Sequence, residues 1–548
     1  MAVGSAVALL VAVGASASAT DAIADTAPAA GVPITVSADA LPTWQINGVV
    51  WSQVIVGTTV YVTGEFTKAR PPGVPAGGSG EVTANNIFAF DISTGNRVSA
   101  FNHSLNAQGR SITASPDGTT IYVGGSFTSV DGAARGHIAA FDTASGTLKS
   151  GFTPNASGSV RAVSATNSVV YLGGGFSAVS GQSRKNLAAV GANGALQAWA
   201  PKADDGSVWS MVVAPDQSRV IVGGAFTTLN GQYAYGMGSL RASGSATAAG
   251  DVLPWAANRT IKDATTTGAI TSLRTDGTLI YGTGYAYGSG SSFEGTFAAT
   301  PGDGSITVLN DCHGDTYDVA PIGPVMYSVG HAHDCRWVRS FPDTSPRVRW
   351  QRALAQTTTA TTTNVGPDNY GWNFNGVPAS AVLQWFPQLD AGTHTGQSQA
   401  AWSVVGNGSY VVLGGEFPRV NGTPQQGLVR MAVSTLAPNK RGPTYTTNPP
   451  RAVPATTATS ASTGSVTVTF GTAWDYDNEN LTYEVFRDAD RVTPVHSTKI
   501  NTNFWTLPTR SFTDSGLRSA STHTYQVRIR DFFGNTLWSP TSNTVTVK

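Results

Sequence analysis

The amino-acid sequence predicts an all-β protein, a seven-bladed β-propeller followed by a smaller antiparallel β-sandwich. One reason is a repeated segment, because Ile121–Phe127 (IYVGGSF) returns with small changes as Tyr171–Phe176, Ile221–Phe226 and Val411–Phe417. A second reason is that no run of the chain has the periodicity of a long amphipathic helix. A third is a change of composition near residue 440, beyond which short alternating segments replace the repeats.

The spacing of the repeats predicts the number of blades. The aromatic residues that end the first four copies lie 61, 49 and 50 residues apart, and they are Phe66, Phe127, Phe176 and Phe226. Less regular copies end at Tyr285 and His331, and the seventh ends at Phe417 after a long insertion. Periods of about 40 to 60 residues built from β-type segments are typical of propeller blades rather than of helical solenoids.

Each copy contains four short segments with the pattern of β-strands. In the third copy these segments are Val160–Val163, Val169–Gly174, Asn186–Val190 and Ala195–Trp199, each apolar or alternating and bounded by turn-forming residues. The Gly-Gly pair has a packing explanation, since residues without Cβ let crowded backbones approach near a propeller axis. The loop after it, Thr128–Gly132 in the second copy, ends in Asp-Gly, which predicts a tight turn.

The two ends of the repeat array are expected to pair. The propeller should span residues 33–440, with its longest insertion at 351–400. After the seventh copy, Gly427–Ala437 supplies one more strand, but no aromatic partner strand follows. We therefore expect Ile34–Ile46 to supply the outer strand of the seventh blade, because such closure removes an exposed sheet edge.

The charge balance excludes some classes of partner. Among 548 residues, 33 Lys and Arg balance 33 Asp and Glu, so the net charge is zero. Such a chain has no long-range attraction for nucleic acid or anionic membranes, and no Lys/Arg-rich stretch contradicts this. We expect a monomer with no nucleic-acid partner and no integral membrane segment.

The amino terminus predicts export. Residues 1–19 read as a signal peptide, because the apolar run Ala6–Gly14 is followed by Ala17-Ser-Ala19, the small-residue pattern of a cleavage site. The run is too short to span a membrane, and it departs from the usual pattern in having no Lys or Arg before it. The protein is therefore expected outside the cell or at its surface.

The two cysteines support this location. Cys312 and Cys335 flank a predicted hairpin whose turn lies near Ile322–Pro324, roughly opposite each other across two strands. In an exported chain a disulfide is the default expectation for such a pair.

The carboxy-terminal part of the chain predicts a second domain. A Pro- and Thr-rich linker at 441–460 precedes residues 461–548, where clean alternation predicts a small antiparallel sandwich. The alternating segments are Val466–Phe470, Leu481–Phe486, Ser511–Thr513, Tyr525–Ile529 and Thr544–Val547.

This second domain resembles a known family. The run Leu517–Tyr525, followed by Val527 and Ile529, resembles the start of strand F in fibronectin type III domains, where the Tyr forms the tyrosine corner. Trp474 resembles their early core tryptophan. The resemblance implies an immunoglobulin-like (fibronectin type III) sandwich. The acidic turn Asp475–Glu479 either binds calcium through its carboxylates or is a solvated turn.

The repeats also resemble a family, the delta-60 repeat type of β-propeller found in large secreted and cell-surface bacterial proteins. The resemblance is carried by copies such as Gly124–Gly132 with His137–Asp142, and it covers roughly residues 33–440. The fifth and sixth copies depart from it, because Gly284-Tyr285 and Gly330-His331 lack the Gly-Gly-x-Phe form. It implies an extracellular scaffold or binding module and brings no catalytic residues with it.

The long insertion carries the first candidate site. Its aromatic residues are Tyr370, Trp372, Phe374, Trp385 and Phe386. If exposed, their flat apolar faces would stack on sugar rings; otherwise they pack the insertion against the propeller rim, because large apolar groups prefer burial.

The histidine-rich segments around the cysteines are the second candidate. A disulfide would draw together His313, Asp315, His331, His333 and Asp334. Residues at i and i+2 of a strand point to one side, so His331 and His333 with a carboxylate could hold a transition metal. The alternatives are a hydrogen-bonded cluster that braces the disulfide and a proton-transfer role. No other cofactor is expected.

The third candidate is a pair of glutamates. The variable position of Gly-Gly-x-Phe is Glu65 in the first copy and Glu416 in the seventh, which ring closure makes neighbours. Paired carboxylates are what glycoside hydrolysis needs. Lys68 and Arg419 offer the alternative of ordinary surface ion pairs.

Two hypotheses follow from these features. The first is a secreted, non-catalytic propeller that binds polysaccharide or another cell-surface ligand on its insertion-bearing face. The alternative is an extracellular glycoside hydrolase or polysaccharide lyase that acts at the propeller mouth through the two glutamates.

Overall fold

The computed structural model describes residues 31–244, 248–263, 267–287, 290–447 and 451–548, so the predicted signal peptide at 1–19 lies outside the described residues. Within those ranges the helical elements are the short helix α1 (Ala257–Thr260) and the 3-10 turn η1 (Arg336–Val338), and all other elements are strands. The all-β prediction is therefore confirmed. No helix in the same ranges has the length and hydrophobicity to cross a membrane.

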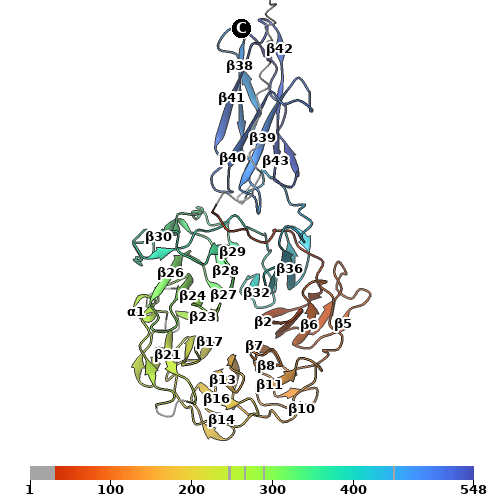
Figure 1. Cartoon of the computed structure of the whole chain (residues 1–548). Coiled ribbons are helices and arrows are strands. Elements are labelled where there is room, and N and C mark those ends of the chain that lie inside the picture. The colour runs from red at the N-terminus through yellow and green to blue at the C-terminus, as the bar shows by residue number, and fades with distance from the viewer. Residues whose placement is uncertain (1–30, 245–247, 264–266, 288–289, 448–450) are drawn as a thin grey trace, which may run out of the picture.

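Seven antiparallel sheets follow one another along the chain and stand in a closed ring (Figure 1). The first strand of each sheet faces the centre, where each lies against the first strand of the next sheet and the last lies against the first. These strands are β2 (Val49–Val56), β7 (Gly109–Ala114), β12 (Val160–Ala165), β17 (Val208–Val213), β23 (Gly268–Thr275), β27 (Thr316–Ile322) and β32 (Ala401–Gly406).

The second and third strands of each sheet continue outward from the first. The second strands are β3 (Thr59–Glu65), β8 (Thr120–Gly125), β13 (Val169–Gly174), β18 (Arg219–Gly224), β24 (Ile280–Ala286), β28 (Val325–Ala332) and β33 (Tyr410–Gly415). The third strands are β6 (Ile87–Asp91), β11 (Ile138–Asp142), β16 (Leu187–Gly191), β21 (Met237–Arg241), β25 (Gly295–Ala299), β29 (Gln351–Thr357) and β36 (Leu428–Ala432).

Side-chain hydrogen bonds join every pair of neighbouring sheets close to the centre. The hydroxyl of Ser52 on β2, for example, accepts a hydrogen bond from the backbone N–H of Ile112 on β7 at 3.2 Å. The last sheet is tied to the first because Gln53 Nε2 donates to Ser403 Oγ at 2.9 Å. The other five pairs of neighbouring sheets are joined by hydrogen bonds between Ser111 and Val163, Ser164 and Val213, Ser210 and Ile270, Ser272 and Asp318, and Asp318 and Val404.

The outermost position of the seventh sheet is filled from the amino terminus, as the sequence predicts. Leu41 forms a β-bridge with Arg430 of β36, and the backbone N–H of Ser37 donates to the carbonyl of Ala432 at 2.8 Å. The fourth and fifth sheets fill this position with β22 (Val252–Leu253) and β26 (Ile306–Asp311), which follow their own third strands. Pairing the two ends of the array covers the outer edge of β36.

The repeated loops form short hairpins on the face where the second strands end. Two-residue turns connect their strands, and both turn residues have positive φ, as at Asp131 (51°) and Gly132 (82°). This is the geometry for which Asn-Gly and Asp-Gly are preferred. The hairpins are β9 (Ser129–Val130) with β10 (Ala133–Ala134), β14 (Ala178–Val179) with β15 (Gln182–Ser183), β19 (Thr228–Leu229) with β20 (Gln232–Tyr233), and β34 (Arg419–Val420) with β35 (Thr423–Pro424).

Two further small sheets lie outside the seven main sheets of the ring. The first joins β1 (Gln45–Ile46), β4 (Lys68–Arg70) and β5 (Val82–Thr83), and the second joins β30 (Thr362–Thr363) to β31 (Pro378–Ala379) inside the long insertion.

The carboxy-terminal residues form two facing sheets with a separate apolar core. One sheet contains β37 (Thr457–Thr459), β38 (Ser465–Gly471) and β41 (Thr509–Ser515). The other contains β40 (His496–Asn501), β39 (Asn480–Arg487), β43 (Tyr525–Arg530) and β44 (Thr536–Trp538), while β42 (Thr522–His523) pairs with β45 (Val545–Thr546). The predicted linker at 441–460 is therefore too long, because β37 already belongs to the sandwich.

The sandwich stands on the rim of the ring (Figure 1), and aromatic side chains fill the contact between them. Trp474 and Phe504 from the sandwich join the same apolar cluster as Phe386 from the ring. The Phe386 and Phe504 rings meet edge to face at 4.9 Å. Trp474 was expected in the sandwich core, and this expectation is wrong, because the residue lies between β38 and β39 and faces the ring.

Polar contacts reinforce this junction. Asp477 accepts hydrogen bonds from the backbone N–H of Ala38 at 2.6 Å and from the hydroxyl of Ser37 at 2.9 Å. Both donors belong to the segment that closes the ring, so the same stretch of chain closes the seventh sheet and holds the sandwich.

Candidate functional site

The first strands of all seven sheets carry the same irregularity. In each, the pairing with the second strand shifts by one residue close to the start of the strand, which is the signature of a β-bulge. The seven bulged residues are Trp51, Arg110, Arg161, Trp209, Thr271, Tyr317 and Trp402. All seven are partly exposed and line the central channel. Bulges re-aim side chains, and here they form a ring of aromatic and cationic groups.

Aromatic contacts connect the bulged residues around the channel. Tyr317 stacks on Trp402 with ring centroids 4.1 Å apart, and Trp402 meets Trp51 edge to face at 5.0 Å. On the opposite arc, Trp209 stacks on Tyr285 at 5.9 Å. These rings contribute flat apolar faces to a channel lining that also contains polar and charged groups.

Two guanidinium groups complete the ring. Arg110 lies 4.7 Å from the centre of the Trp51 ring and Arg161 lies 4.4 Å from that of Trp209, both in cation–π geometry. Within the described residues neither guanidinium has a hydrogen bond or an ion pair to a carboxylate within 4 Å. Burial, and the neighbouring charge of Arg110, lower the pKa of Arg161 to about 10. Burial also lowers the pKa of Arg110, an effect that the more distant carboxylate of Glu65 opposes.

The channel has room for a ligand. One mouth holds a cavity of about 420 Å³, whose rim includes Tyr285, Tyr287, Asp315 and Gln397, and a cavity of about 440 Å³ continues from it along the channel. Small-molecule sites usually fall in this range of volumes. The mouth lies on the face where the second strands end, since Tyr285 near the end of β24 belongs to its rim.

Sequence reasoning missed this ring of residues. Their position within the repeat could have identified these residues. Each bulged residue lies 14 to 17 positions before the residue that ends its repeat, as Trp51 does before Phe66. The bulges move these side chains onto the channel face, out of the simple alternation of a strand.

The predicted aromatic platform of the insertion is mostly wrong. Trp385, Phe386 and Phe374 are buried, with exposed fractions of 0%, 1% and 5%. Phe386 packs at the junction with the sandwich, Trp385 packs on Tyr327 of β28, and Phe374 packs beside Phe293 in a core cluster. Tyr370 is exposed and Trp372 is partly exposed, yet both lie against the ring of His313.

The two glutamates differ in environment. Glu416 is buried, and its carboxylate accepts hydrogen bonds from Thr395 N, Thr395 Oγ1 and Trp402 Nε1 at 2.8, 2.6 and 3.0 Å. It thereby orients Trp402 at the channel mouth. Glu65 is exposed, and its Oε1 lies 4.0 Å from Nε2 of His394. Neither glutamate forms the predicted ion pair with Lys68 or Arg419 among the described contacts.

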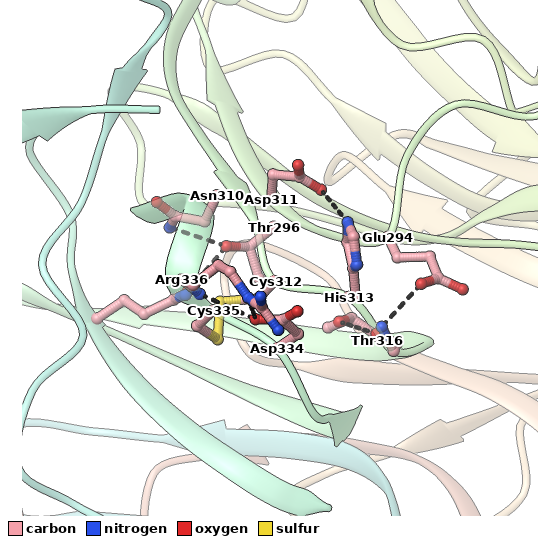
Figure 2. The surroundings of a disulfide bond; sticks show 12 residues. Glu294, Thr296, Asn310, Asp311, Cys312, His313, Thr316, Asp334, Cys335 and Arg336 are labelled. Atoms are coloured by element: carbon pink, nitrogen blue, oxygen red, sulfur yellow. Dashed lines mark hydrogen bonds and ion pairs between the residues drawn. A yellow bond between two sulfur atoms is a disulfide. The ribbon is translucent and has the colours of Figure 1, made fainter. Parts of the chain in front are cut away.

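The predicted disulfide is confirmed. Cys312 follows β26 and Cys335 precedes η1, and their sulfur atoms are bonded (Figure 2). The nearby carboxylate of Asp334 accepts a hydrogen bond from Arg336 Nε at 2.8 Å.

The disulfide does not collect the histidines into one metal site, as the sequence suggested it could. His331 Nδ1 lies 3.1 Å from Gln399 Oε1, and Asp315 accepts a hydrogen bond from the hydroxyl of Tyr317 at 3.0 Å. His333 Nδ1 lies 3.4 Å from Asp343. The strand is irregular beyond Val329, so the simple i, i+2 rule fails for His331 and His333.

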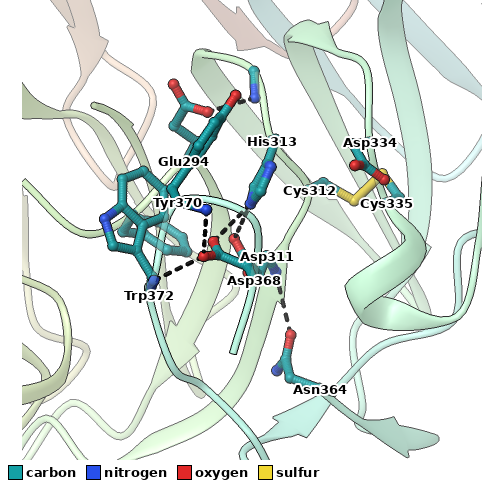
Figure 3. A network of polar contacts seen from close by, with 12 residues as sticks. Glu294, Asp311, Cys312, His313, Asp334, Cys335, Asn364, Asp368, Tyr370 and Trp372 are labelled. Carbon is teal, nitrogen blue, oxygen red and sulfur yellow. Dashed lines mark hydrogen bonds and ion pairs between the residues drawn. A yellow bond between two sulfur atoms is a disulfide. The ribbon is translucent and has the colours of Figure 1, made fainter. Parts of the chain in front are cut away.

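His313 belongs to a different group, which includes two carboxylates that sequence reasoning did not select. Its Nε2 lies 2.7 Å from Asp368 Oδ2 and 3.6 Å from Asp311 Oδ1 (Figure 3). Burial, followed by the charge of Asp368, raises the pKa of Asp311 to about 8. Burial also raises the pKa of the adjacent Glu294 to about 8 and lowers that of His313.

The acidic turn Asp475–Glu479 is only partly solvated. Asp475 is buried at the junction with the ring, Asp477 is partly exposed, and Oδ1 of Asp475 accepts a hydrogen bond from the backbone N–H of Asp477 at 3.2 Å. Among the described residues these two carboxylates belong to no group with metal-ligand geometry.

Comparisons with known proteins add little to this description. No family model and no curated protein sequence matches the chain. Among solved structures, the chain is similar to the crystal structure of the tricorn protease, with 9% sequence identity and a TM-score of 0.23. The alignment covers 91% of this chain and 48% of the tricorn chain, so this chain spans about half the length of that protein. A likeness of this size carries no argument about activity.

Proposed function

We propose that the chain is a secreted, non-catalytic binding protein whose central channel mouth holds a polysaccharide that bears negative charge. In this proposal the ring of sheets is a seven-bladed β-propeller of the delta-60 repeat type. The sandwich is a fibronectin type III-like domain that acts as a spacer on the cell surface. The observation that carries the proposal is the ring of seven bulged residues, which places three tryptophans, a tyrosine and two arginines around one opening.

The aromatic residues support a carbohydrate ligand. Trp51, Trp209 and Trp402 are partly exposed toward the cavity, and hydrogen bonds or stacking contacts hold the first and the last in place. A flat ring that is fixed in orientation loses little entropy when it covers the C–H face of a sugar.

The arginines support a negative charge on that carbohydrate. Arg110 and Arg161 stand on neighbouring sheets, close enough for the charge of one to lower the pKa of the other. A carboxylate or sulfate between them would relieve this repulsion and accept charge-assisted hydrogen bonds, for which the guanidinium fork is well suited.

The disulfide supports the extracellular location, since disulfides persist in oxidising compartments. The hydrolase or lyase alternative has less support, because three donors from Thr395 and Trp402 already engage the carboxylate of Glu416. That carboxylate therefore orients a tryptophan rather than standing free for a substrate.

Binding measurements with the full chain test the proposal. We expect the protein to retain a polyuronide such as polygalacturonate and to bind a neutral glucan less tightly. Trp209→Ala should weaken polyuronide binding at least about tenfold, since truncating a tryptophan that anchors a binding site costs about 2 kcal/mol or more. Trp350→Ala is the matched control, because Trp350 is exposed outside the channel. No binding of any anionic polysaccharide by the unaltered protein would refute the proposal.

A further inference from the structure

The group around His313 lies at a junction between separate parts of the chain. Asp311 is the last residue of β26, His313 follows Cys312 of the disulfide, and Asp368 comes from the long insertion. One donor atom from each lies within 4.8 Å of the other two, and the side chains of all three are no more than 2% exposed. Two segments that are distant in sequence therefore present an imidazole nitrogen and two carboxylate oxygens to one point.

Within the part of the chain that the structure describes, one of the two carboxylates, that of Asp311, lacks the hydrogen-bond partners that a buried acid requires. Oδ1 of Asp311 has no hydrogen bond among the described residues. The ion pairs of Asp311 and Asp368 in the described structure involve only His313, and no Arg or Lys lies within 4 Å of either carboxylate. Removing two carboxylates from water without a cation is costly, and Glu294 adds a third acid nearby.

The orientation of Asp368 is already fixed. Its other oxygen, Oδ1, accepts hydrogen bonds from the backbone N–H groups of Tyr370 at 2.9 Å and Trp372 at 2.7 Å. Tyr370 also stacks on His313 with ring centroids 4.2 Å apart (Figure 3). Outer contacts that hold the ligand side chains in place are typical of metal sites.

We propose that Asp311, His313 and Asp368 bind a divalent first-row transition metal. One imidazole nitrogen with two carboxylate oxygens is a donor set that Zn²⁺ and its neighbours accept, whereas Ca²⁺ and Mg²⁺ prefer oxygen ligands alone. The metal would tie the long insertion to β26 beside the disulfide. This site is independent of the ligand that the channel mouth binds.

The test uses the full chain without a histidine tag. Metal content is measured on protein as purified, and thermal unfolding is then followed after EDTA treatment and after addition of Zn²⁺, Mn²⁺ or Ca²⁺. We expect about one transition metal per chain, a lower melting temperature after EDTA, and recovery with Zn²⁺ or Mn²⁺ but not with Ca²⁺.

Two variants locate the effect. Asp311→Asn keeps the shape of the side chain and should weaken Zn²⁺ binding by more than about 100-fold, since even outer contacts of metal sites contribute 10- to 100-fold. His331→Gln is the matched control, because that imidazole lies outside the group, and it should bind Zn²⁺ normally. Absence of bound metal together with no effect of EDTA, selective recovery with Ca²⁺, or equal Zn²⁺ affinity in Asp311→Asn would each overturn the proposal.

Discussion

Replacing Arg161 tests whether the channel mouth recognises a negative charge. Arg161→Gln removes the guanidinium charge while keeping a polar side chain of moderate length on the bulge of β12. The protein loses the cation–π contact with Trp209, which contributes about 0.5–1 kcal/mol at a partly exposed site. It also loses the repulsion from Arg110. Because these two changes oppose each other, we expect the free energy of unfolding to change by less than about 1 kcal/mol.

The effect on binding should be much larger. A hydrogen bond to a charged group contributes about 1.5–3 kcal/mol, and its loss corresponds to a dissociation constant that is about 10- to 140-fold higher. Isothermal titration calorimetry of the full chain with a polyuronide measures this constant directly. Raising the ionic strength should weaken binding to the unaltered protein more than binding to the variant, because salt screens the lost interaction.

The matched control is Lys185→Gln, which removes the same charge from an exposed residue in the loop before β16, outside the cavity. It should leave the dissociation constant within about twofold. Two results would show that the channel arginines do not recognise the negative charge of the ligand. Either the Arg161→Gln variant binds polyuronide as tightly as the unaltered protein, or Lys185→Gln weakens binding as much as Arg161→Gln does.

Four further predictions concern stability. Replacing both cysteines by serine opens a covalent loop with a sequence separation of 23 and should lower the free energy of unfolding by about 3.5 kcal/mol; an unchanged urea midpoint would contradict this. Trp474→Ala should lower the free energy of unfolding by about 3–5 kcal/mol, and calorimetry should then show separate unfolding transitions for the sandwich and the ring. A single transition at the unaltered temperature would show that the junction does not couple the two domains. A Cβ on Gly174 would overlap the backbone carbonyl of Ser159, so Gly174→Ala should lower the free energy of unfolding by at least about 1–3 kcal/mol. The control is Gly151→Ala, because a Cβ at Gly151 meets open space. Equal stability of the two variants would disprove the packing argument. Burial, and then the carboxyl of Asp477, raise the pKa of Asp475. The stabilising contribution of Asp475 is therefore complete below the unfolded value of about 4 and is lost as the pH rises through the raised folded value. Asp475→Asn should flatten this decline in unfolding free energy, and an unchanged pH profile would count against it.

The prediction of the site failed where it depended on exposure. Trp385 and Phe386 belong to an aromatic-rich insertion, and nothing in the local pattern distinguishes a ligand platform from an interdomain contact. Phe386 packs against Phe504 of a domain that begins about 70 residues later in the chain, and Trp385 packs on Tyr327 of the ring. His313 belongs to a different polar group from the one the sequence suggested, because its partner Asp368 lies 55 residues away on an irregular loop.

The sequence by itself determined the all-β class, the repeated sheet unit, the tight turns, the pairing of the cysteines and the closure of the ring by the amino-terminal segment. These features arise from local periodicity, from turn chemistry and from the count of repeats, all of which can be read along the chain. Only the tertiary structure decided which side chains meet in the channel, because seven bulges on seven strands turn Trp51, Arg161 and their counterparts toward one axis. It also decided which carboxylates lie next to His313 and which aromatic residues the sandwich covers. Those contacts join segments that are far apart in sequence, and their geometry depends on how whole sheets pack rather than on any local pattern.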